Sequence, residues 1–297
     1  MRNRIKAVML VIASIIALSG IGCHTILDGR ESSAAERAAA VDLSLPFDAY
    51  ELTGEARSRY DRALDLLARA CMNNAGFDWY VPPQPNPGFD VKRRRYGVID
   101  PDVAERIGYH LPVSAQSQLT LRKRNEILKN PRAADKFFGT NKAGNSGGSG
   151  RPADDGCAMW AYHRLERSVG KTDEQLLIRL DRASLDAAKN QPSVQAVNKS
   201  WQTCMRSRGL SYASPDDAIA DKAWKLNTPT VSAKEREVAT ADVICKYQVD
   251  MVDVARRAEV MIQQKNIAEN RTELELLRQA TQARERNVAA VLESLER

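Results

Sequence analysis

A Cys-Met dipeptide, followed at fixed offsets by a glycine and an aromatic residue, occurs twice in this chain and constrains its fold most strongly. The two copies read CMNNAGFDW from Cys71 and CMRSRGLSY from Cys204. A proline also matches three residues after the aromatic position, and an alanine matches eight residues before each cysteine. Agreement at so many fixed offsets indicates an internal duplication.

Each copy of the motif predicts the end of a helix. The preceding segments, residues 53–70 and 192–203, have helical character. Gly76 and Gly209 occupy the place where a left-handed residue ends a helix, and the apolar residue after each glycine supplies the contact that accompanies such a cap. Each motif cysteine is therefore expected in the last turn or so of a helix.

The N-terminus predicts export. Three basic residues precede the apolar run Ala7–Leu18, which has the plan of a secretory signal and is too short to span a bilayer comfortably. The run leads into LSGIGC, which resembles the lipobox of bacterial lipoproteins and predicts a signal peptide at residues 1–22. The resemblance implies that Cys23 carries a diacylglycerol and acyl chains such as palmitate, which would hold the protein at a membrane. Gly20 stands where that family generally carries Leu, so an ordinary signal peptide and an uncleaved anchor remain alternatives.

Four further cysteines predict two disulfides. An exported chain with an even number of cysteines beyond its anchor most simply pairs them, because the compartment outside the membrane is oxidising. Four cysteines allow three connectivities. Each motif copy has its own later cysteine, which favours the pairs Cys71–Cys157 and Cys204–Cys245.

We therefore expect a mainly α protein, a disulfide-stapled helical body with an internal duplication and a long C-terminal helix. The expected parts are a lipidated tether at 23–46, a first helical half at 47–170 with a Gly/Ser-rich loop at 141–156, and a second half at 171–297. Neither Gly nor Pro occurs from residue 235 onward, so the long helix is expected to begin there. Its last thirty residues or so either project as an arm, a hairpin or a coiled coil, or fold back onto the body. Strands are hard to place, although the proline-rich stretch at 79–99 could hold a short hairpin.

Charge argues against nucleic acid as a partner. The chain has 44 basic and 38 acidic residues, a net charge of +6. Removal of the signal takes three basic residues with it and leaves 41 basic and 38 acidic residues, a net charge of +3. The densest basic cluster is interleaved with aromatic residues and could meet an anionic wall polymer or lipid headgroups, or form a solvated loop. Its members are Lys92, Arg93, Arg94 and Arg95.

The search for catalytic and metal-binding residues finds little. Beyond His24, only His110 and His163 could serve a nucleophilic site, and neither lies near a nucleophile motif. Zinc shared by Cys71, Cys157 and His163 lacks the usual close ligand pair, so we expect no metal and no cofactor. Asp216 and Asp217 follow Ser-Pro, which is typical of a helix start. The carboxylates nearest the aromatic and Gly-rich loops are Asp78, Asp90, Asp154 and Asp155.

Taken in order, the motifs resemble a family of uncharacterised exported lipoproteins of high-GC Gram-positive bacteria. The more specific features are Trp201-x-x-Cys204-Met205 and the Ala-Asp-Val-x-Cys segment that ends at Cys245. The resemblance implies a compartment and a helical fold but no activity. The leading hypothesis is a lipoprotein on the outer face of the cytoplasmic membrane, a non-enzymatic interaction or adaptor module that docks an envelope protein or wall polymer. The alternative is a cell-wall-active hydrolase that uses the aspartates named above.

Overall fold

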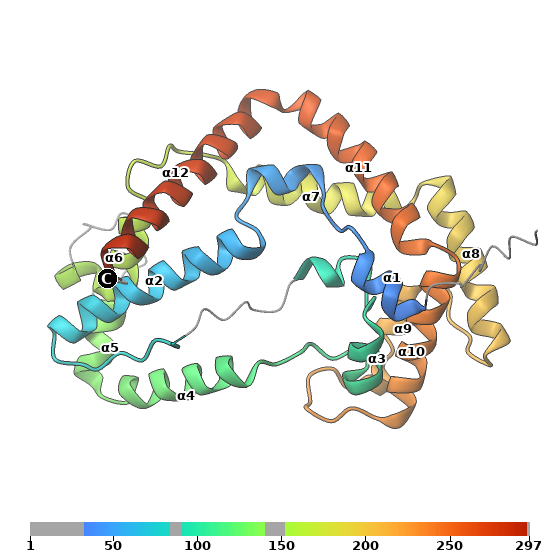
Figure 1. The fold of residues 1–297 in the computed structure, drawn as a ribbon, viewed down its shortest axis with the longest axis horizontal. Helices are drawn as coiled ribbons and strands as arrows, with labels where there is room; N and C mark the ends of the chain where they lie inside the picture. Colours follow the sequence, from blue (N-terminus) through green and yellow to red (C-terminus); the bar gives the residue numbers. More distant parts are fainter. Residues whose placement is uncertain (1–32, 84–90, 140–151, 296–297) are drawn as a thin grey trace, which may run out of the picture. The chain divides into compact units, whose positions relative to one another are not determined.

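The computed structural model describes residues 33–83, 91–139 and 152–295 (Figure 1). These residues form twelve α-helices and three short 3-10 helices, with no strand among them, so the predicted mainly α fold is confirmed. The elements are α1 (Ala34–Ala40), η1 (Pro46–Tyr50), α2 (Gly54–Asn74), η2 (Val91–Arg94), α3 (Pro101–Ile107), α4 (Ala115–Leu128), α5 (Pro131–Phe138), α6 (Pro152–Leu165), α7 (Glu174–Lys189), α8 (Pro192–Ser207), α9 (Pro215–Ile219), η3 (Lys222–Trp224), α10 (Ala233–Gln248), α11 (Met251–Glu269) and α12 (Arg271–Leu295). In place of the hairpin considered at 79–99, the described part of that stretch contains η2.

The two motif copies end α2 and α8 in the same way. The backbone N–H of Phe77 donates to the carbonyl of Met72 at 3.0 Å, and that of Leu210 donates to Met205 at 3.0 Å. The glycines before them have φ of +82° and +74°, in the left-handed region that favours glycine. The predicted helix ends are confirmed at both copies.

Two disulfides join the helices in the predicted pairs. Cys71–Cys157 links α2 to α6, and Cys204–Cys245 links α8 to α10. The bridged Cα atoms are 5.6 Å and 5.7 Å apart, within the usual range. Each bridge lies in its own cluster of buried apolar side chains, so the body has two stapled centres.

A buried polar network lies beside the second disulfide. Trp201 on α8 donates its indole N–H to Asp242 on α10 at 3.0 Å, and Lys246 donates to the same carboxylate at 2.8 Å. Trp201 and Asp242 each precede a bridged cysteine by three residues. The Trp201 motif on α8 and the Asp242 motif on α10 therefore connect the same two helices, by a hydrogen bond and by a disulfide.

The two predicted halves exchange elements, and the residues described from Ser33 onward form one compact unit. The C-terminal helix α12 packs on α2 and α6, and its Val288 and Val291 belong to the cluster around Cys71. In the other direction, α1 and α3 pack on α10. The boundary drawn at residue 170 therefore does not separate the two packing clusters.

The segment from residue 235 is three helices and not one, which corrects the expected start of the long helix. Asp250 lies between α10 and α11, and its φ of +55° interrupts the helix there. The Nη1 of Arg37 in α1 donates to the Asp250 carboxylate at 2.9 Å. Asn270 separates α11 from α12, and its side chain donates to the Asn266 carbonyl. Asp and Asn tolerate non-helical conformations because their short polar side chains bond locally. The long C-terminal helix is α12, with 25 residues, and it folds back onto the body.

The second part of the expected tether also belongs to the body. Ser33 begins α1 with a reciprocal capping box to Glu36. Ala38 and Leu45 are buried, so this segment contributes side chains to the core of the body. The expected signal peptide, Cys23 and the rest of the tether lie outside the described residues. Within the described part of the chain, no helix combines the length and the apolar character needed to cross a bilayer.

The Gly/Ser-rich loop expected at 141–156 is shorter than predicted at its C-terminal end. Residues from Pro152 onward already belong to α6, which kinks at Gly156, where φ is +76°. A Cβ at Gly156 would lie within 2.6 Å of backbone atoms of residues 137–139, so only glycine fits this close approach. The remainder of the loop lies outside the described residues.

Candidate functional site

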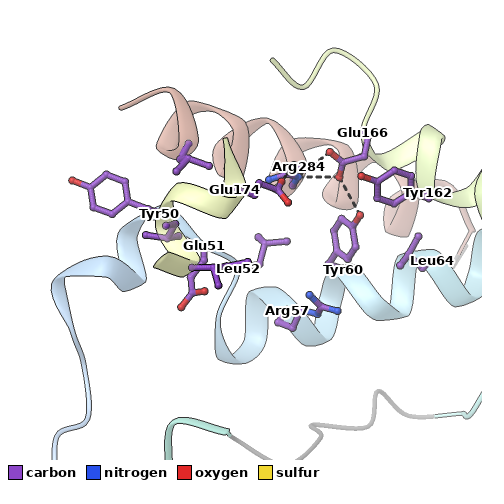
Figure 2. A pocket seen from close by; sticks show the side chains of 13 residues that line it. Tyr50, Glu51, Leu52, Arg57, Tyr60, Leu64, Tyr162, Glu166, Glu174 and Arg284 are labelled. Atoms are coloured by element: carbon purple, nitrogen blue, oxygen red, sulfur yellow. Dashed lines mark hydrogen bonds and ion pairs between the residues drawn. The ribbon is translucent and has the colours of Figure 1, made fainter. Parts of the chain in front are cut away.

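A hollow lies among η1, the first turns of α2, the end of α6, α7 and α12 (Figure 2). Its volume is about 460 Å³, within the range of small-molecule sites. Three tyrosines, five aliphatic residues, three glutamates and two arginines line it. The hollow thus combines apolar walls with a small number of charged groups.

Arg284 of α12 organises one end of the hollow. Its Nε lies 2.9 Å and 3.0 Å from the two carboxylate oxygens of Glu166, and its Nη2 donates to Glu174. Tyr60 of α2 donates its hydroxyl to Glu166 at 3.1 Å (Figure 2). Burial opposes the charge of Arg284, but the hydrogen bonds and charges of both glutamates raise its pKa overall. This network joins α2, α12 and the α6–α7 connection around a fixed guanidinium.

The phenols beside this network remain protonated. Burial raises the pKa of Tyr60, and the adjacent Glu166 carboxylate raises it further. The pKa of Tyr162 is raised by burial and by the charges of Glu166 and Glu174. Both tyrosines therefore line the hollow as neutral phenols, and neither is prepared to act as a base. The Arg57 guanidinium already lies over the Tyr60 ring, 5.9 Å from its centroid.

Glu51 lies at another part of the hollow and differs from the two paired glutamates. Among the described residues, no hydrogen bond or ion pair reaches its carboxylate. Displacement of water by the surrounding protein raises its pKa, with Asp181 and Asp48 acting in the same direction and Lys92 and Arg95 opposing them. Glu51 is thus a carboxylate available to a ligand.

The aspartates predicted for a hydrolase do not line the hollow. Asp78 is exposed and Asp155 is buried, and neither contributes to the hollow's wall. Asp90 and the side chain of Asp154 lie outside the described residues. The carboxylates that do converge are Glu166 and Glu174, which sequence reasoning missed because their common partner, Arg284, is more than a hundred residues away.

The side chains of the basic cluster are partly buried and make contacts within the protein. Lys92 pairs with Asp48 of η1. Arg95 pairs with both Asp181 of α7 and the buried Glu259 of α11. The neighbouring guanidiniums bond to backbone carbonyls, Arg93 to Ala38 at 3.1 Å and Arg94 to His110 at 2.7 Å. These cationic side chains therefore make ion pairs and hydrogen bonds within the protein, and the contact with an anionic polymer stays a prediction.

His110 and the bridged cysteines have structural partners, whereas the buried Nε2 of His163 has no hydrogen-bond partner among the described residues. His110 is buried between the Glu235 carboxylate, 2.8 Å from Nδ1, and the Thr228 carbonyl, 2.9 Å from Nε2. Cys71 and Cys157 are joined to each other, so neither sulfur is a free thiolate for zinc. The interpretation of SPDDA as a helix start is confirmed, because the Ser214 hydroxyl accepts from the backbone N–H of Asp217.

Comparisons of the chain with protein-family models, with curated proteins and with solved structures found no match. The interpretation of the hollow therefore rests on its own geometry.

Proposed function

We propose that the chain is an exported lipoprotein, anchored through Cys23 to the outer face of the cytoplasmic membrane, and that it works as a non-enzymatic interaction module. The partner is a protein or polymer of the cell envelope, and the hollow beside Arg284 is where it binds. The observation that carries this proposal is the hollow itself, a preformed recess with apolar walls and a fixed Tyr60–Glu166–Arg284–Glu174 network. Binding sites of this kind fix orientation with few polar groups.

Export is supported by the cysteines. Both disulfides close between helices, and disulfides persist in oxidising compartments and are rare in reducing ones. The lipobox-like sequence that ends at Cys23 supports the anchor. Nine residues lie between Cys23 and Ser33, where the compact unit begins, so an anchor at Cys23 would hold the body to the membrane by a short segment.

The hydrolase alternative is less well supported by the hollow. A glycosidase needs one carboxylic acid that donates a proton and a second carboxylate with a different role. Here the guanidinium of Arg284 lies between Glu166 and Glu174 and pairs with both. Neither of these two carboxylates is free to protonate a leaving group, so Glu51 is the one carboxylate among the described residues of the wall that could act as the acid.

Two measurements test the proposal. Replacing Cys23 by Ala should release the protein from the membrane fraction or leave an unprocessed precursor, and a Cys23→Ala protein that kept both size and attachment would refute the anchor.

A photo-crosslinker placed at Ile178, an exposed residue of the hollow's rim, should form a discrete adduct in native membranes. The same crosslinker at Met261, which is exposed on α11 away from the hollow, is the control. Equal adducts at both positions would refute the hollow as the binding site, and wall-polymer hydrolysis lost on Glu166→Gln would establish the enzyme instead.

A further inference from the structure

The wall of the hollow carries more negative than positive charge. Three carboxylates and two guanidiniums line it. One of the guanidiniums, that of Arg57, is already paired with Asp61 at 3.0 Å, and Asp61 is not part of the wall. The hollow and Asp61 therefore hold two negative charges in excess. The charges nearest Glu51, two cations (Lys92 and Arg95) and two anions (Asp48 and Asp181), cancel one another, so a cationic ligand is favoured.

The excess charge is divided between two places. One negative charge belongs to Glu51, whose carboxylate has no bonding partner among the described residues. The other belongs to the network of Glu166, Glu174 and Arg284 (Figure 2). Aliphatic side chains line the wall as well, and they include Leu52, Leu64, Leu177 and Leu277. A matching ligand has an alkyl chain and at least one terminal cation.

The tyrosines suit an ammonium group in particular. Tyr60 donates its proton to Glu166, so the lone pairs of its oxygen remain available to an N–H donor. Tyr162 is 42% exposed, and no hydrogen bond to its hydroxyl occurs within the described residues. The face of such a ring attracts a cation electrostatically. An anionic ligand has no comparable site here, because both guanidiniums are already paired with carboxylates.

We infer that the hollow binds a linear aliphatic ammonium ion, either a free diamine or the side chain of a lysine on a partner. The alkyl chain lies against the leucines of the wall. One ammonium pairs with Glu51, and a second, where the ligand has one, lies by Tyr60, Tyr162 and the outer face of Glu166. The inference rests on the proposed function, since it names the chemistry that the same hollow recognises.

Calorimetric titration of the processed protein in a neutral detergent tests the inference. The probe is cadaverine, a linear diamine, and the diol of the same chain length is the neutral control. We expect the diamine to bind and the diol not to bind. Glu51→Gln should lower the affinity for the diamine about fivefold, because one partly solvated ion pair is lost. Glu105→Gln makes the same change on the exposed face of α3, away from the hollow, and should leave the affinity unchanged.

A second pair of titrations distinguishes the two sources of the ammonium. One ligand is a peptide with a single lysine, and the other is the same peptide with that lysine acetylated. Tighter binding of the lysine peptide than of free diamine identifies a partner side chain, and the reverse order identifies a free diamine; both results support the inference. The inference would be overturned if diamine and diol bound with equal affinity. It would also be overturned if Glu51→Gln and Glu105→Gln lowered the affinity for the diamine equally. If Ile178 still crosslinks specifically while amines do not bind, the ligand chemistry is wrong and the proposed function stands.

Discussion

At the scale of single residues, the core contains a buried ion pair between Asp242 and Lys246. Asp242 is fully buried and Lys246 is 1% exposed. Burial raises the pKa of Asp242, while Lys246, Trp201 and Tyr109 act in the opposite direction. The ammonium also donates to the Val98 carbonyl at 3.0 Å, so both charges are compensated by several hydrogen bonds. Such a pair adds little net stability, but removing either partner leaves a buried charge unpaired.

Breaking this pair should therefore destabilise the protein strongly and non-additively. Asp242→Asn and Lys246→Met should each lower the free energy of unfolding by about 3–5 kcal/mol, and the double variant by less than the sum. Urea unfolding of the four proteins measures the coupling. The control pair is Lys234 with Glu237 on the same helix, where both side chains are 59% exposed. Its variants should change stability by less than about 1 kcal/mol, and additive losses at the buried pair would contradict the assignment.

Residues of the candidate site were harder to predict than residues of the core. Trp201 and Asp242 stand in recognisable motifs, each three residues before a bridged cysteine. Glu166 and Arg284 stand in no motif. Their pairing depends on where α12 returns along α2, and a side-chain pair separated by 118 residues has no local signal.

At the scale of elements, the sequence predicted helix ends well where glycine or proline marks them. The caps at Gly76 and Gly209 and the Ser-Pro start of α9 all occur as expected. The breaks at Asp250 and Asn270 were missed, because Asp and Asn permit a break without requiring one. At Asp250 the deciding contact comes from Arg37, which lies on a segment expected to be a tether.

The two glycine caps provide a matched test of the duplication. A Cβ at Gly76 or Gly209 would meet no atom within 4 Å, so the cost of alanine there is backbone strain alone. Gly76→Ala and Gly209→Ala should each lower the free energy of unfolding by about 1–2 kcal/mol, and by similar amounts. Gly170 is equally open and does not have a positive φ, so Gly170→Ala is the control and should be neutral or slightly stabilising. Thermal unfolding followed by circular dichroism measures all three, and a neutral result at either cap would contradict its left-handed conformation.

At the scale of the whole molecule, local patterns could not reveal which helix packs on which. Helical periodicity identifies the apolar face of each helix, but it does not say which other face packs against it, because several helices have apolar faces of similar width. The sequence therefore left open whether the last thirty residues project or fold back. In the structure α12 covers the first disulfide, while α1 and α3 cover α10 beside the second. Each stapled cluster is completed by a helix from the other end of the chain.

This exchange predicts that the two clusters unfold together. Tryptophans report on them separately, because Trp79 and Trp160 lie in the cluster around Cys71–Cys157, and Trp201 and Trp224 lie in the cluster around Cys204–Cys245. Replacing one tryptophan pair by Phe leaves fluorescence from the other cluster alone. With both disulfides intact, the two reporters should show the same midpoint in guanidinium chloride, because α12 and α3 cannot leave one cluster without exposing it.

Removing one disulfide should lower both midpoints together. The Cys71–Cys157 bridge closes 86 residues and the Cys204–Cys245 bridge closes 41, which correspond to about 4.6 and 3.9 kcal/mol in the chain-entropy model. Replacing both cysteines of either bridge by Ala should therefore cost a similar amount. Non-reducing peptide mapping should still recover the other bridge. If the reporter in the unaltered cluster kept its original midpoint while the other fell, the clusters would be independent domains. The exchange of helices between them would then contribute nothing to cooperativity.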